Sequence, residues 1–184
     1  MLFLAGRTDL VFTCSWSDWF HAHADAWRPE AWSTIRRCTN LVFQIITKRP
    51  ERIQDHLPPD WGQGYKNVWL GVSVERNDYI WRADVLRSIP AQSRWICAEP
   101  LLGPLPDLNL EGINWLVLGG ESGPDWRPMD LSWVRELRDK CRSAGVAFYF
   151  KQANGRYPGM NFLLDGQLYQ EMPAVPQGSL PLFQ

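Results

Sequence analysis

Six short segments of almost uncharged, mostly branched or aromatic residues recur along this chain, and a charged residue follows each of them closely. Their first residues lie between 21 and 31 positions apart. That spacing is typical of βα units, in which a helix or loop crosses over between two parallel strands. The six predicted strands are Leu10–Trp16, Leu41–Ile46, Val68–Val72, Arg94–Ala98, Trp115–Leu118 and Val146–Phe150. We therefore expect an α/β fold with a parallel sheet.

Helical patterns fall between most of these strands. Pro29–Cys38 and Glu51–His56 are predicted helices, and apolar residues at helical spacing follow Asn77. Asp130 is predicted to cap a further helix that ends at Gly145. The connection between the fourth and fifth strands is short and rich in proline, so we expect a loop or a short turn there.

The expected fold is a partial (β/α) TIM-like barrel of about six parallel strands, with a C-terminal hairpin and a loose tail. Periodicity does not distinguish this barrel from an open doubly wound sheet, but both bind ligands at the carboxyl ends of the strands. Residues 1–155 are predicted to form the barrel domain. Residues 156–184 are predicted to hold the hairpin, with an Asp165-Gly166 turn, and a Pro/Gly/Ser-rich tail.

Charge and cysteine content limit the classes of partner and compartment. The chain has 19 basic and 20 acidic residues, a balance that argues against strong non-specific nucleic-acid binding. No apolar run approaches the ~20 residues of a membrane span. The four cysteines are spaced too widely for a zinc ribbon or a redox pair, and reduced thiols fit a cytoplasmic protein.

Ionisable side chains follow all six predicted strands. Carboxyl ends of parallel strands meet at one rim of the sheet, so these side chains are expected to form a ligand site there. Lys and Arg can hold a carboxylate or a phosphate, and Glu can bind an ammonium group or ribose hydroxyls or relay protons. The candidate ligand-binding residues are Asp18, Lys48, Arg49, Glu75, Glu99, Gly119, Gly120, Glu121 and Lys151.

The same residues allow other interpretations. Gly119 and Gly120 let the loop before Glu121 fold tightly over a small molecule, but a solvated acid in a turn has the same sequence. Three carboxylates can also hold a divalent metal ion, and a ring of mutual ion pairs can simply close the rim. The sequence contains no GxGxxG, GxxxxGK[ST], HExxH or GxSxG motif. The motifs that usually indicate a nucleotide-binding fold or a hydrolase are therefore missing.

Several stretches, taken in order, resemble a known family. The similarity is to the phage and prophage proteins named for gene products 37 and 68, which are similar to radical S-adenosylmethionine enzymes and are largely uncharacterised. The stretches that carry it are Ser15–Asp18, Thr47–Arg52, Trp69–Glu75, Glu99–Pro104, Gly119–Gly123 and Phe150–Gln152.

This resemblance implies a partial barrel that binds S-adenosylmethionine and a [4Fe–4S] cluster at its rim. In such proteins the cluster is held by a cysteine-rich segment upstream of the strand that here precedes Cys14. This sequence begins only a few residues before that strand, so we expect the cluster ligands to be absent from this chain.

The expected function is that of a radical S-adenosylmethionine-like barrel protein of unknown substrate, without cluster chemistry in this chain. The alternatives are a cluster-free small-ligand-binding module and a metal-dependent hydrolase or nuclease that uses the rim carboxylates. A small molecule is the expected partner. Loss of a barrel's first βα unit would expose a strand edge, so self-association through that edge is also expected.

Overall fold

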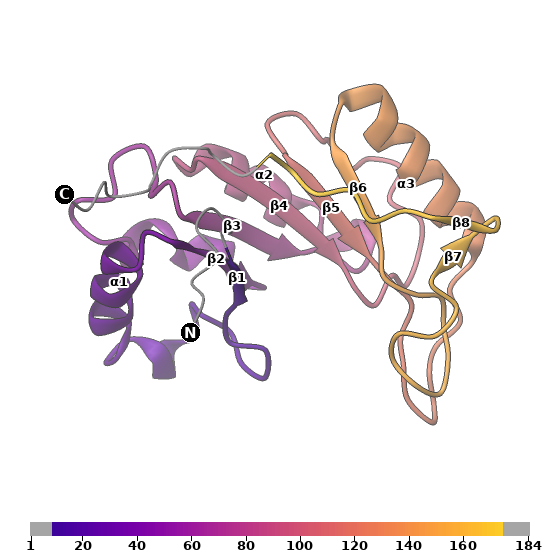
Figure 1. Ribbon diagram of the computed structural model, residues 1–184, viewed down its shortest axis with the longest axis horizontal. Coiled ribbons are helices and arrows are strands. Elements are labelled where there is room, and N and C mark those ends of the chain that lie inside the picture. The colour runs from indigo at the N-terminus through magenta and orange to yellow at the C-terminus, as the bar shows by residue number, and fades with distance from the viewer. Residues whose placement is uncertain (1–8, 175–184) are drawn as a thin grey trace, which may run out of the picture.

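The computed structural model describes residues 9–174 and contains a six-stranded parallel sheet (Figure 1). Strand order follows chain order, from β1 to β6, and the sheet is curled into a half-barrel. A doubly wound sheet would instead reverse its strand order partway along the sheet. The strands are β1 (Asp9–Phe12), β2 (Leu41–Thr47), β3 (Val68–Ser73), β4 (Ser93–Ala98), β5 (Trp115–Leu118) and β6 (Ala147–Phe150).

Three α-helices pack on the convex face of the sheet: α1 (Arg28–Arg37), α2 (Trp81–Ser88) and α3 (Leu131–Ala144). Residues 9–174 also form four 3₁₀ turns, η1 (Ala22–Ala24), η2 (Pro50–Arg52), η3 (Gln54–His56) and η4 (Asn77–Tyr79). As predicted, Asp130 caps α3 by accepting a hydrogen bond from Ser132 N, and Gly145 ends it with a φ of 67°. No helix within residues 9–174 is long and apolar enough to cross a membrane.

Two predicted elements differ from the structure. The first strand ends at Phe12 rather than Trp16, because Cys14 has a φ of 54° and Ser17 N donates back to its carbonyl oxygen in a turn. The predicted helix over residues 51–56 is instead the two 3₁₀ turns η2 and η3. The sequence patterns therefore located both segments but missed the local turns within them.

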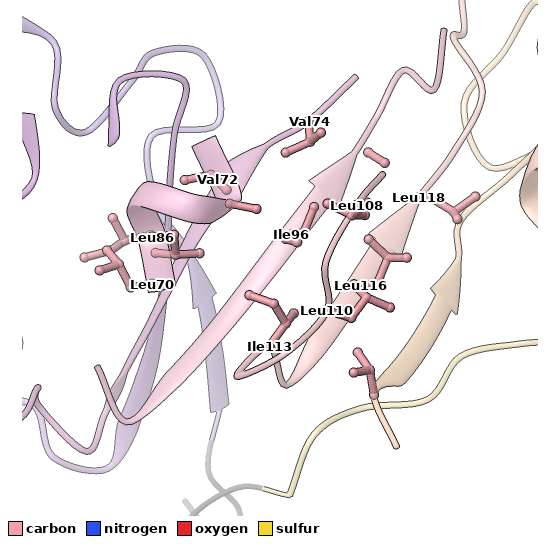
Figure 2. Packing of buried hydrophobic residues seen from close by; sticks show 14 of the residues in the cluster. Leu70, Val72, Val74, Leu86, Ile96, Leu108, Leu110, Ile113, Leu116 and Leu118 are labelled. Carbon is pink, nitrogen blue, oxygen red and sulfur yellow. The ribbon is translucent and has the colours of Figure 1, made fainter. Parts of the chain in front are cut away.

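The main core lies between the convex face of the sheet and the helices. Leu86 of α2 packs with Leu70 and Val72 of β3 (Figure 2). Between β4 and β5 there is no helix, as expected; the loop over residues 99–114 supplies buried side chains instead. Figure 2 shows three of them, Leu108, Leu110 and Ile113, in the same cluster as Ile96 and Leu116.

A second apolar cluster lies on the concave face. Its centre is formed by Trp69, Trp95 and Trp115, from three adjacent strands. The ring centroid of Trp115 lies 5.7 Å from that of Trp69 and 5.5 Å from that of Trp95. The register pairs Gly71 of β3 with Trp95 of β4, and the Trp95 indole lies over the glycine and donates to the carbonyl of Trp69. The concave face is therefore lined by large aromatic rings.

The two edges of the sheet differ. Beyond the small hairpin of β7 (Leu163–Leu164) and β8 (Gln167–Leu168), residues 169–171 run antiparallel to β6 and pair with it. At the other edge, β1 presents Leu10 and Phe12 with half-exposed side chains. Of the predicted tail, residues 175–184 lie outside the described residues.

We predict that Gly71→Ala destabilises the fold by about 1–3 kcal/mol, because the added methyl group would overlap the buried Trp95 indole. Urea denaturation measures the change. Gly103→Ala is the matched control, since an added Cβ there meets no atom within 4 Å, and it should change stability by less than about 0.5 kcal/mol. Equal stability of the two variants would contradict this packing.

Candidate functional site

The predicted ionisable residues all lie at the carboxyl-terminal end of the sheet, which we call the rim. They do not form one cluster. Each of the four rim carboxylates instead makes its own ion pair, so the mutual ion pairs considered from the sequence are present. The pairs are Asp18–Arg49, Glu75–Lys48 with Arg82, Glu99–Lys151, and Glu121–Arg127.

Asp18 joins the ends of β1 and β2. Its carboxylate accepts hydrogen bonds from Phe20 N, Thr47 Oγ1, Lys48 N and Arg49 Nη1 at 2.7–2.9 Å. Burial alone would raise the pKa of Asp18. The bonds from Lys48 N, Thr47 and Phe20 N, together with the charge of Arg49, outweigh burial and hold the pKa below its usual value. Because its acceptor sites are occupied by donors of the chain itself, Asp18 holds together the loops that follow β1 and β2.

Glu75 lies between two cations after β3. Its side chain is 6% exposed, and it contacts the Lys48 ammonium group and, at 3.1 Å, the Arg82 guanidinium of α2. Arg82 also donates to the Ser73 carbonyl and stacks on Tyr79. The cluster carries one more positive than negative charge, and the Lys48 side chain remains half exposed.

Glu99 and Lys151 form a pair that crosses β5. Lys151 Nζ lies 2.6 Å from Glu99 Oε2, and Gln152 Nε2 donates to the other carboxylate oxygen at 2.8 Å. Gly119 lies between them in the sheet register, and a Cβ there would come within 3.3 Å of both Glu99 Oε1 and Lys151 Cβ. The glycine therefore makes room for this ion pair.

Glu121 points toward a different loop. Arg127 binds its carboxylate through the side chain and through its own backbone N–H, and these contacts lower the pKa of Glu121 to about 2. Gly120 packs against the backbone of Asn154, where a Cβ would clash. Neither Gly119 nor Gly120 has a positive φ. The two glycines thus allow close packing of the loops after β5 and β6.

A groove on the concave face, which we call the concave groove, leads up to the Glu99–Lys151 pair. Its volume is about 360 Å³. The lower part of the groove, farther from the rim, is lined by aromatic rings. Its upper end, at the rim, is formed by the ion pair. Its lining residues are Leu10, Phe12, Gln44, Trp95, Cys97, Glu99, Trp115, Val117, Tyr149, Lys151 and Met172. Only Glu99 and Lys151 among the predicted site residues line it.

Sequence reasoning missed the residues of the groove wall. Gln44, Trp95 and Tyr149 lie inside predicted strands, whereas the site candidates were taken only from the segments that follow the strands. The signal was the alternation along each strand: every second residue of β2, β4 and β6 lies on the concave face, where the groove is. In a curled sheet, alternate residues of a strand face opposite sides. One set packs on the helices, and the other set lies on the concave face, where a ligand can bind.

The four cysteines do not assemble into a cluster site. Cys14 lies in the turn after β1, Cys38 ends α1, Cys97 faces the groove, and Cys141 is buried in α3. Burial, with the nearby Glu99, raises the pKa of the Cys97 thiol to about 12. Within residues 9–174, no three His, Cys, Asp or Glu side chains come together as metal ligands. These residues therefore do not fit a [4Fe–4S] cluster.

The curled parallel sheet, with its charged rim and lined concave face, defines a half-barrel of the (β/α) class. The chain belongs to the family described as protein of unknown function DUF5131, whose model matches residues 5–173. That match spans every strand, the rim and the hairpin. Comparison with the curated proteins and with the solved structures found no match.

We predict that Asp18→Asn lowers stability by about 1–3 kcal/mol at neutral pH, because an amide replaces one acceptor oxygen with a donor that faces other donors. The pKa of Asp18 is lowered in the folded state, so its ionised form stabilises the fold above the unfolded pKa of 3.8. That contribution is lost as the pH falls below this value. The difference from wild type should therefore shrink between pH 7 and pH 3.

Urea denaturation at the two pH values measures this difference. Asp78→Asn is the control, since the Asp78 side chain is 77% exposed and its only ion pair within residues 9–174, with Arg76, spans 3.9 Å. The control should change stability by less than about 0.5 kcal/mol. A difference for Asp18→Asn that grows as the pH falls would contradict the assignment.

Proposed function

We propose that this chain is a small-molecule-binding half-barrel and that its ligand occupies the concave groove. The observation that supports the proposal is the combination of an aromatic floor with an ion pair at the upper end of a groove of ligand size. Pockets of this volume, mostly apolar with a few converging polar groups, are typical of small-molecule sites. The compartment we propose is the cytoplasm.

The Glu99–Lys151 pair favours a zwitterionic ligand. A ligand ammonium group can bind Glu99 while a ligand carboxylate binds Lys151, and neither protein charge is then left uncompensated. Lys151 is accessible for this exchange, because its side chain is 43% exposed and its ammonium group has two further donors. The rings of Trp95 and Trp115 offer apolar faces to the rest of the ligand.

S-adenosylmethionine is the ligand that we propose first, in agreement with the resemblance to radical S-adenosylmethionine-like phage proteins. Its amino-acid end would lie at Glu99 and Lys151, and its flat base and sulfonium cation would face the aromatic rings. The cysteines described above do not fit a cluster, so the proposal is limited to binding. Here the chain's own residues hold and orient the ligand.

We predict that Lys151→Met weakens S-adenosylmethionine binding about tenfold, which is the loss of one charge-assisted contact. Glu99→Gln should weaken it similarly through the ammonium group. Isothermal titration calorimetry measures the affinities. Arg127→Met is the control, because Arg127 is also a rim cation paired with a carboxylate but does not line the groove.

The control variant should bind as wild type does. Equal weakening in Lys151→Met and Arg127→Met would point to a general charge effect and contradict binding in the groove. No binding by the wild-type chain at millimolar concentration would remove S-adenosylmethionine as the ligand.

Self-association through the β1 edge stays a prediction. The register directs the backbone N–H and C=O groups of Leu10 and Phe12 away from β2, and they have no backbone partner among residues 9–174. Such an edge can pair with a second copy. Sedimentation velocity over a range of concentrations tests it, and a monomer at all concentrations would contradict it.

A further inference from the structure

The contacts of the Gln44 side chain do not explain why a polar residue stands at this position of β2. Its residue exposure is 8%, and its side-chain amide has no hydrogen-bond partner anywhere in the described chain. Its backbone carbonyl, by contrast, accepts from both Thr13 N and Thr13 Oγ1. The amide atoms are not among the fully buried side-chain atoms without a partner, so a ligand in the groove can reach them. The Gln44 amide instead faces the concave groove.

A second unpartnered polar atom lies at the same level of the sheet. The register aligns Phe12, Gln44 and Trp69 across β1, β2 and β3. The Trp69 indole N–H is buried and has no acceptor within the described residues. The other two tryptophans of the concave face are satisfied, Trp95 by the Trp69 carbonyl and Trp115 by the Glu171 carbonyl.

We propose that Gln44 is a specificity-determining residue that reads the hydrogen-bonding edge of a flat heterocycle of the nucleobase type. This inference rests on the proposed function, because it assigns the lower part of the groove whose upper end binds the charged group. A primary amide presents one donor and one acceptor side by side. It pairs in a bidentate way with a ring edge that carries the complementary acceptor and donor, as adenine does.

The surrounding rings support a planar ligand. Phe12, Trp95 and Trp115 line the groove beside Gln44, and aromatic side chains are the usual stacking partners of bases. A purely apolar ring would stack equally well but would cover the Gln44 amide without pairing it. Discrimination between such rings should therefore depend on Gln44.

The test compares adenosine with benzimidazole riboside, a nucleoside with a ring of similar size that lacks the amino group. Quenching of tryptophan fluorescence measures both affinities. The wild-type chain should prefer adenosine by about tenfold. Gln44→Met keeps the length of the side chain but removes the amide, and should abolish the preference by weakening adenosine binding. Gln54→Met, at an exposed position outside the groove, should behave as wild type.

Stability distinguishes a ligand-reading role from a structural one. Gln44→Met removes an amide that has no hydrogen-bond partner within residues 9–174, so its urea midpoint without ligand should equal or exceed that of wild type. A lower midpoint would mean that Gln44 supports the fold and would overturn the inference. An equal preference for adenosine in wild type and Gln44→Met would also overturn it.

The remaining outcomes separate the two proposals. If wild type binds both nucleosides equally, the groove binds ligands and only the role of Gln44 fails. If neither nucleoside nor S-adenosylmethionine binds, the proposed function fails and this inference fails with it. Competition between adenosine and S-adenosylmethionine shows which molecule supplies the ring that binds at Gln44. Displacement of adenosine by S-adenosylmethionine assigns the site to its own base, and simultaneous binding assigns it to a separate substrate.

Discussion

The contact of Trp95 with Gly71 determines the shape of the concave face. Because β3 has no side chain at this position, the Trp95 indole can lie flat across the strand and donate to the carbonyl of Trp69. Trp115 then packs against both rings. The interior of a closed eight-stranded barrel is filled by side chains from all its strands. In this half-barrel, tryptophans cover the floor and leave a groove above them.

Charge compensation governs the other end of the groove. Each of the four rim carboxylates has a cationic partner, so the described part of the rim presents no unpaired carboxylate to attract a metal ion or a cation alone. A ligand that brings both charges can replace one ion pair by two without leaving a buried charge uncompensated. Of the four groups, only Glu99–Lys151 lies where the groove reaches the rim. The Glu99–Lys151 pair therefore differs from the other three groups in its location at the groove, not in its residue types.

Sequence predicted the parts of this arrangement that depend on local composition. Uncharged runs identified all six strands, and the charges after them were correctly placed at one rim. Pairing partners such as Arg82 and Arg127 were missed, because they come from a helix and a loop whose approach to the rim depends on packing. Gln44 was missed because its position on the concave face follows from the register of three strands. The glycine pair was noticed, but its contacts are with Glu99, Lys151 and Asn154 of the chain itself.

The central claim is that the concave groove is the ligand site, and the tryptophan side chains report on it directly. The side-chain indole N–H signals of the tryptophans can be followed in a ¹H–¹⁵N correlation spectrum while S-adenosylmethionine or adenosine is added. Binding in the groove should shift the signals of Trp95 and Trp115. It should leave unchanged those of Trp32, on α1, and Trp61, which pack together in the main core on the convex face. Shifts confined to Trp32 and Trp61, or no shift at any indole, would contradict the account.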